Sequence, residues 1–360
     1  MSNYDENFEQ ELKVLVQEYE ESLENNAPKF HDEETYEQII EYYEDRNELI
    51  KANKVIDQAL QHYAYSSELM IRKSNLLILE KKYSEALIWI EKARSFDPQN
   101  MSIYILRSDI YLDEGKPKQA IQSLEQAMKV ADVKDIPDLF LEIAEVYEST
   151  DQYDKALDAV VDCLKMNAFN GEALHKIWFI VEITKQFDKS IEIHERVIEQ
   201  DPYSYLAWYN LGQSLEGLHY YKKAIESYEY VIAINDKFDL AYKDCGELYR
   251  KLGDFDNAIE YLKKALRLSM HLDDISLSLA KVYQEMNDMK MAVFYFKKVV
   301  GYDRMHDEAW FELGNCYRDS CQWSKAEAAY KQAIEINNKL PEYALRLSDV
   351  YYLTGNTDQA

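Results

Sequence analysis

Glycine and proline are scarce in this chain of 360 residues, which holds only 9 glycines and 6 prolines. Folds rich in strands and turns need more of both, so their scarcity favours helices joined by short connections. The N-terminus, MSNYDENFEQ, lacks the basic and apolar segments of a secretory signal, and we expect none. No run of 18 apolar residues is present, and we therefore expect no membrane insertion.

Cysteine and the motifs of enzyme chemistry are scarce as well. The 4 cysteines lack paired spacing, which fits a reducing compartment and predicts a cytoplasmic location. Cys316 and Cys321 lie about 140° apart around a helix axis, so they cannot share a metal site. The histidines form no H-x-x-x-H pair, and neither a glycine-rich phosphate loop nor a G-x-S-x-G elbow occurs. We predict a non-enzyme with no catalytic residues, metal or cofactor in residues 1–360.

Positively charged residues are also too few to balance the acidic ones. Against 67 Asp and Glu stand 41 Lys and Arg, a formal net charge of −26. A field of this sign repels nucleic acid and anionic membranes, which excludes both as expected partners. Residues 1–66 are the most acidic part, with 17 acids and 5 bases. This excess is either a solvated surface or an attraction for a basic segment of a partner.

The sequence repeats itself with a period of 34 residues. The segment AWYNLGQSLEGLHYYKKAIESYEYVIAIN at 207–235 aligns with AYKDCGELYRKLGDFDNAIEYLKKALRLS at 241–269 and with AWFELGNCYRDSCQWSKAEAAYKQAIEIN at 309–337. Repeats of this length are typical of solenoids. Nine full units span 33–340 and a partial tenth spans 341–360; the full units begin at residues 33, 67, 101, 137, 171, 205, 239, 273 and 307.

These units resemble the tetratricopeptide repeat family, which pairs two antiparallel helices in 34 residues. The family wants a small residue at position 8, and three units have Gly212, Gly246 and Gly314 there. It wants alanine at position 20, which holds in eight units: Ala52, Ala86, Ala120, Ala156, Ala224, Ala258, Ala292 and Ala326. Small residues at a helix crossing allow close approach, and stacked pairs share one continuous core. The resemblance implies an all-α, right-handed α-solenoid (a superhelix) of antiparallel helix pairs.

The sequence departs from the pattern in three places. Residues 133–136 lengthen one turn between units. The unit at 171 has Trp178 at position 8, Ser190 at position 20 and His194 at position 24, so its helices should lie further apart or be shifted. Ala360 falls inside the expected second helix of the tenth unit, and we interpret the chain as a fragment of a longer protein. Residues 1–32 predict an acidic amphipathic helix that caps the first unit, with partner binding as the alternative.

The resemblance also implies a concave groove, lined by positions 2, 5, 9, 12 and 13 of each first helix. In the first unit these positions are acidic: Glu34, Glu37, Glu41, Glu44 and Asp45. From the fifth unit onward the candidates are aromatic, polar and charged: His175, Phe179, Tyr209, Gln213, Lys243, Glu247, Arg250, Lys281, Phe311 and Asn315.

An extended peptide fits this profile. Its apolar side chain would meet Phe179 and Tyr209, because exposed aromatic residues flanked by charge are typical of binding hot spots. Its acidic end would lie toward Lys243, Arg250 and Lys281, and its basic end toward the acidic early units. The alternative is that the aromatic residues pack against the next first helix.

The resulting prediction is a non-catalytic scaffold or adaptor that binds a protein or peptide. The alternative is a substrate-recognition region of an enzyme whose catalytic domain follows residue 360. Self-association through an exposed C-terminal repeat is a third possibility, since a bare terminal repeat leaves apolar surface uncovered.

Overall fold

The structure, a computed structural model, describes residues 3–24 and 30–355 as twenty helices with short connections. They fall into two compact units, residues 1–167 and 168–360. The first unit contains α1 (Asn3–Glu24), α2 (Glu33–Asp45), α3 (Leu49–His62), α4 (Ser67–Leu79), α5 (Tyr83–Phe96), α6 (Met101–Asp113), α7 (Pro117–Val130), α8 (Ile136–Glu148) and α9 (Tyr153–Met166). The second unit contains α10 (Gly171–Thr184), α11 (Phe187–Gln200), α12 (Tyr205–Gly217), α13 (Tyr221–Ile234), α14 (Asp239–Lys251), α15 (Phe255–Leu268), α16 (Leu272–Glu285), α17 (Met289–Tyr302), α18 (Asp307–Asp319), α19 (Trp323–Ile336) and α20 (Pro341–Thr354).

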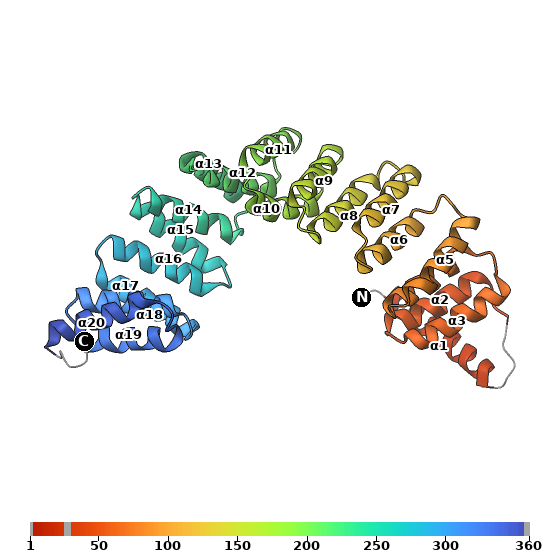
Figure 1. The fold of residues 1–360 in the computed structure, drawn as a ribbon, viewed down its shortest axis with the longest axis horizontal. Helices are drawn as coiled ribbons and strands as arrows, with labels where there is room; N and C mark the ends of the chain where they lie inside the picture. The colour runs from red at the N-terminus through yellow and green to blue at the C-terminus, as the bar shows by residue number, and fades with distance from the viewer. Residues whose placement is uncertain (1–2, 25–29, 356–360) are drawn as a thin grey trace. The chain divides into compact units, whose positions relative to one another are not determined.

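Within each unit, consecutive helices form antiparallel pairs that stack on one another (Figure 1). The first helices begin at, or within one residue of, the predicted repeat starts. Since the described residues contain helices and no strands, the predicted all-α solenoid is confirmed; the hand of its superhelix stays a prediction. The connection before α8 has five residues, 131–135, whereas the one before α6 has four, 97–100. The second helix predicted for the tenth repeat lies outside the described residues.

The turn inside each repeat places position 15 in the left-handed region. In the turn after α4, the Lys81 N–H donates to the Ile78 carbonyl and the Lys82 N–H to the Leu77 carbonyl, both at 2.8 Å. These two bonds form a Schellman motif, which needs a positive φ at its C′ residue. Among the described residues, all those with positive φ occupy this one position: Asn47, Lys81, Gly115, Asp151, Lys185, His219, Gly253, Asn287, Cys321 and Gly355. Cys321 therefore lies in a turn and has no part in a thiol site with the buried Cys316.

Replacing Cys321 with glycine should stabilise the chain by about 0.5–1 kcal/mol, because its φ of 56° strains a residue that has a Cβ. Thermal unfolding under reducing conditions would show a higher midpoint. The control is Ser320→Gly, one residue earlier, where φ is −90° and glycine should lower the midpoint. Equal shifts for the two variants would contradict this account of the turn.

The core of each repeat lies where its two helices cross. The eight alanines predicted at position 20 are all fully buried. At position 8, a Cβ added to Gly212 would lie 2.4 Å from the Tyr228 ring, and one added to Gly314 would lie 2.6 Å from the Tyr330 ring. The helices therefore approach as closely as these residues allow, which agrees with the predicted role of the two positions.

The fifth repeat, α10 and α11, is the exception that its sequence predicts. Trp178 at position 8 is 44% exposed, and it lines a small cavity together with Phe187 and Ser190 of α11. α10 and α11 are the least closely packed pair among the described repeats, and α11 packs mainly on α12. His194 is fully buried there, and neither ring nitrogen has a hydrogen-bond partner. Burial lowers the pKa of this imidazole to about 3.

The acidic N-terminal helix α1 adds to the core of the first repeat. Val16 and Tyr19 are buried against α2 and α3, and the Tyr19 hydroxyl donates to Gln58 Oε1 at 2.7 Å. Glu20 Oε1 accepts hydrogen bonds from the Tyr43 hydroxyl and the Lys51 ammonium, both at 2.9 Å. These bonds tie α1 to both helices of the first repeat.

Candidate functional site: the first-helix face of the second unit

The candidate site is the face formed by the first helices α10, α12, α14, α16 and α18, which we call the first-helix face. It carries all ten predicted aromatic, polar and charged candidates. His175 and Phe179 are exposed on α10, and Phe179 keeps 50% of its surface accessible. These two residues fit the prediction of an accessible surface.

Two of the aromatic candidates are not accessible, and the expectation that they are exposed is wrong. Tyr209 packs edge-on against Phe238, with ring centroids 4.9 Å apart, and keeps only 9% of its surface. Phe311 stacks on Tyr343 of the next first helix, with centroids 4.6 Å apart. The ring that covers Phe311 belongs to the following repeat, whereas Phe238 is the last residue of the repeat that contains Tyr209. The alternative of packing against the next first helix therefore describes Phe311, and Tyr209 reaches that helix through its hydroxyl, which donates to Asp244 at 2.7 Å.

Two amide candidates are also held by their neighbours. The Asn315 side chain accepts a hydrogen bond from the Tyr330 hydroxyl at 2.7 Å and donates to Glu312 at 3.2 Å. Gln213 is half-buried, and its side-chain oxygen is enclosed without a hydrogen-bond partner. Asn315 thus supports the packing of α18 on α19, and its polar atoms are already used.

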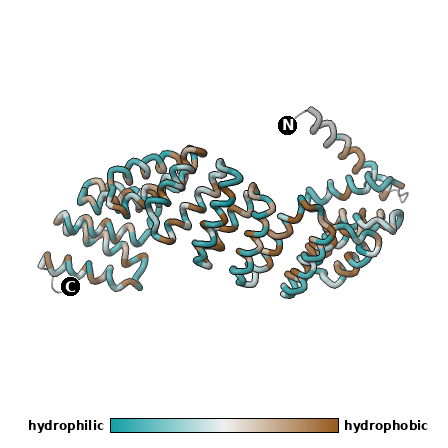
Figure 2. The backbone as a smooth tube through the Cα atoms, turned by 90° about the horizontal axis from the view of Figure 1, so that it is seen from above, coloured by the Kyte–Doolittle hydropathy of each residue, from teal (hydrophilic) through white to brown (hydrophobic). Residues whose placement is uncertain are grey.

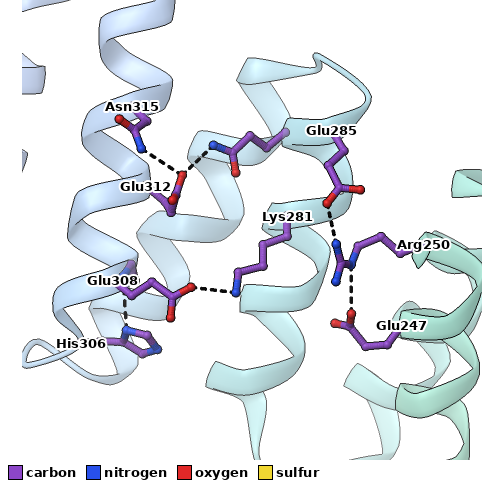
Figure 3. Close-up of polar contacts among 10 residues, drawn as sticks. Glu247, Arg250, Lys281, Glu285, His306, Glu308, Glu312 and Asn315 are labelled. Carbon is purple, nitrogen blue, oxygen red and sulfur yellow. Dashed lines mark hydrogen bonds and ion pairs between the residues drawn. The ribbon is translucent and has the colours of Figure 1, made fainter. Parts of the chain in front are cut away.

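The cationic candidates form a series of ion pairs that link successive first helices (Figure 3). Arg250 on α14 binds Glu247 at 2.9 Å and reaches Glu285 of α16 at 2.5 Å. Lys281 on α16 binds Glu308 of α18 at 2.8 Å.

Two further contacts extend this series. Lys243 on α14 lies 3.5 Å from Asp274, and the amide of Gln284 donates to Glu312 at 2.8 Å. The basic part of the predicted groove is therefore charge-compensated, and a ligand carboxylate has to compete with acids already in place.

Asp244, which the sequence analysis did not single out, lies beneath this face. Its carboxylate accepts a hydrogen bond from the Tyr209 hydroxyl at 2.7 Å, which joins α12 to α14. Burial raises the pKa of Asp244 to about 7, although the Tyr209 hydrogen bond acts in the opposite direction. A buried carboxyl that titrates near neutrality couples the charge of this face to pH.

The acidic candidates of the first unit all lie on α2. Glu34, Glu41 and Asp45 are exposed, whereas Glu37 and Glu44 are half-buried. Burial raises the pKa of Glu37 and of Glu44, even though Glu44 accepts an ion pair from Arg72 at 2.9 Å. A raised pKa shows that negative charge is disfavoured here, so an added cation would stabilise the surface.

The contacts that the sequence analysis missed follow from the repeat register. Lys243 stands at position 5 and its partner Asp274 at position 2 of the next repeat, while Lys281 at position 9 meets Glu308, also at position 2 of the next. Comparing each groove position with position 2 of the following repeat would have paired these charges. Nothing in the pattern would have identified Asp244 as a titrating group, because its pKa depends on burial.

The described residues contain neither a His, Cys, Asp and Glu group able to hold a metal ion nor a helix long and apolar enough to cross a membrane. In Figure 2 hydrophobic and hydrophilic residues alternate within the helices instead of forming a continuous apolar helix.

Fold and repeat geometry define the chain as an α-helical repeat protein. Two tetratricopeptide repeat family models match it, one at residues 307–340 and the other at residues 102–132, 205–238, 245–269 and 274–304. The chain therefore contains tetratricopeptide repeats in each of these segments. Repeats of this family generally mediate protein–protein interactions and are generally non-catalytic.

Among solved structures, one similar chain is the C-terminal part of a TPR repeat-containing protein from Cytophaga hutchinsonii. It is 17% identical, with a TM-score of 0.46, over 77% of this chain and 99% of that one. No curated protein matches the chain.

Proposed function

We propose that the chain is a scaffold that binds a peptide segment of a partner protein on the first-helix face of the second unit. The observation that carries the proposal is the series of half-exposed charge pairs between α14, α16 and α18. Such pairs present alternating charge along the face in a fixed order, which suits an extended peptide with charges of both signs.

The energetics favour exchange of these pairs for pairs with a ligand. A partly exposed ion pair contributes about 0–1 kcal/mol, so a peptide carboxylate can replace Glu285 or Glu308 at small cost. Phe179, exposed on α10 in the same unit, supplies an apolar contact for the ligand. Tyr209 supports the face from beneath and does not contact the ligand.

The proposal is tested by selecting binding sequences from a library of random twelve-residue peptides and measuring their Kd by fluorescence anisotropy. Arg250→Ala/Lys281→Ala should weaken the selected peptides about 10-fold or more, since two charge-assisted contacts are lost. Phe179→Ala should weaken them about 5-fold or more through loss of the apolar contact. Circular dichroism and melting of each variant would show that the fold is kept.

The matched control is Lys290→Ala/Lys339→Ala, which removes the same charge from exposed positions elsewhere in the second unit. Its Kd should equal that of the parent chain. Peptides that bind the parent and both double variants equally well would place recognition elsewhere and refute the proposal.

The role of α1, the cellular location, the enzyme alternative and self-association are proposals as well. We take α1 as a cap on the first repeat, supported by its bonds to α2 and α3. The four cysteines are not joined in disulfides, which agrees with a reducing, cytoplasmic setting for an adaptor. A substrate-recognition role within a larger enzyme would use the same face, and self-association would use α20, where Leu345, Tyr352 and Leu353 are exposed.

A further inference from the structure

The second helices of the fifth and sixth repeats enclose a cavity on the other side of the second unit from the first-helix face. Its volume is about 350 Å³, and its sides come from α11 and α13 with α12 as the floor. We call it the Trp208 cleft. Its lining residues recur at helical spacing and are Ile191, Glu195, Trp208, Leu211, Leu215, Tyr220, Lys223, Glu226, Ser227 and Tyr230.

The aromatic wall of this cleft is held in place before any ligand arrives. The Trp208 indole N–H donates to the Pro202 carbonyl at 3.0 Å, and its ring stacks on Tyr230 with centroids 4.3 Å apart. Tyr230 keeps 54% of its surface exposed, and Tyr220, which lines the same cleft, keeps 56% of its surface exposed. Ordered, accessible aromatic faces of this kind attract a cation through their ring quadrupole.

Two carboxylates line the same cleft from opposite sides. Glu195 comes from α11 and Glu226 from α13. Both are exposed, and among the described residues neither takes part in an ion pair or a hydrogen bond. Lys223 is the single cation of the lining, and its ammonium lies 5.9 Å from the Tyr220 ring centroid. The cleft therefore carries a net negative charge that the protein itself leaves uncompensated.

The ninth repeat provides an internal comparison. Trp310 occupies the same repeat position as Trp208 and makes the same indole bond, to the Arg304 carbonyl at 3.0 Å. The surrounding residues differ: Lys297, Ala328 and Gln332 stand at the repeat positions of Glu195, Glu226 and Tyr230. The tryptophan of the ninth repeat therefore packs in the same way without two glutamates and a second aromatic ring beside it. Glu195, Glu226 and Tyr230 thus distinguish the Trp208 cleft from the corresponding surface of the ninth repeat.

We infer that the Trp208 cleft binds an arginine side chain of a basic segment in a partner protein. The methylene groups of arginine match the apolar floor, and its planar guanidinium can stack on the aromatic wall while donating to both carboxylates. An adjoining cavity of about 440 Å³ shares Glu226 and adds Glu229, Asp254 and one cation, Lys222, so its lining is also net negative. This site is independent of the proposed function, because it lies on the other side of the second unit and shares no residue with the first-helix face that we propose for the peptide.

The test is a titration of the full ¹⁵N-labelled chain with N-acetyl-arginine amide at physiological ionic strength. Indole N–H signals report binding, and Trp208→Phe and Trp310→Phe identify the two resonances. The Trp208 signal should shift to saturation with a Kd on the order of millimolar, whereas the Trp310 signal should stay unchanged. The uncharged isostere N-acetyl-citrulline amide should shift neither signal.

Charge variants separate this site from general attraction to an acidic protein. Glu195→Gln/Glu226→Gln should raise the Kd at least about 5-fold, since both charged acceptors are lost. The control Asp236→Asn/Asp256→Asn makes the same change in net charge at exposed positions outside the cleft and should leave the Kd unaltered. Shifts that are equal for arginine and citrulline, equal at Trp208 and Trp310, or insensitive to the glutamate variant would each overturn the inference.

Discussion

Replacing His194 with leucine is expected to stabilise the second unit by about 1–3 kcal/mol at neutral pH. The imidazole is fully buried and both ring nitrogens lack a partner, so each loses its hydrogen bonds to water on folding without replacement. Leucine already fills the same repeat position at Leu262, which is fully buried against its helix pair. The free energy of unfolding from denaturant titration measures the gain.

The gain should increase as the pH falls. The pKa of His194 is lowered from 6.5 to about 3 in the folded chain, with burial as the cause. Below pH 6.5 the His194 imidazole is therefore protonated in the unfolded state but stays neutral in the folded state. Because of this difference, the free energy of unfolding decreases as the pH falls from 6.5 toward 3. Between about pH 7.5 and pH 5.5 the difference between the parent chain and His194→Leu should widen by about 1.4 kcal/mol.

Other titrating groups do not affect the difference in stability between the parent chain and His194→Leu. Burial raises the pKa of Asp109 to about 6 and that of Asp244 to about 7, so these carboxyls favour the folded state as the pH falls. Both proteins contain them, and their contribution cancels in the difference. His271→Gln, at an exposed histidine, should show no such widening. A difference between parent and His194→Leu that stays constant with pH would contradict the burial of an uncharged ring.

The sequence predicts the fold well because its signal is repeated. A single Gly212 or Ala224 says little, but the same residue types every 34 positions specify the helix crossing and the register of each pair. The fifth repeat shows that departures are equally informative. Trp178 in place of a small residue and Ser190 in place of alanine predicted a looser pair, and α10 and α11 are packed in that way.

The site was predicted less well, because groove positions were assigned repeat by repeat. Exposure of Tyr209 depends on Phe238 at the end of its own repeat, and the charge available at Lys281 depends on Glu308 of the next repeat. A periodic pattern gives the direction of a side chain but does not say what the following repeat places against it. The Trp208 cleft was missed for the same reason, since it combines residues from two second helices and one first helix.

Gly212→Ala is expected to destabilise the second unit by about 2–3 kcal/mol, although alanine is the better helix former. The added Cβ would lie 2.4 Å from the Tyr228 ring, which is fully buried and whose hydroxyl donates to Glu216 at 3.2 Å. Because that ring is held at both ends, it cannot move aside without breaking contacts on the far side. Thermal and denaturant unfolding measure the loss.

Gly301→Ala in α17 is the matched control, because a Cβ there meets nothing within 4 Å. The same substitution should then stabilise the chain by up to about 1 kcal/mol through helix propensity alone. A rescue variant follows from the fourth repeat, where Ala144 at position 8 faces Val160 at position 24 and both are fully buried. Gly212→Ala/Tyr228→Val should therefore lose less stability than the sum of its two single variants, since the smaller side chain removes the clash. Additive losses would mean that Gly212 is required for another reason than the approach of the Tyr228 ring.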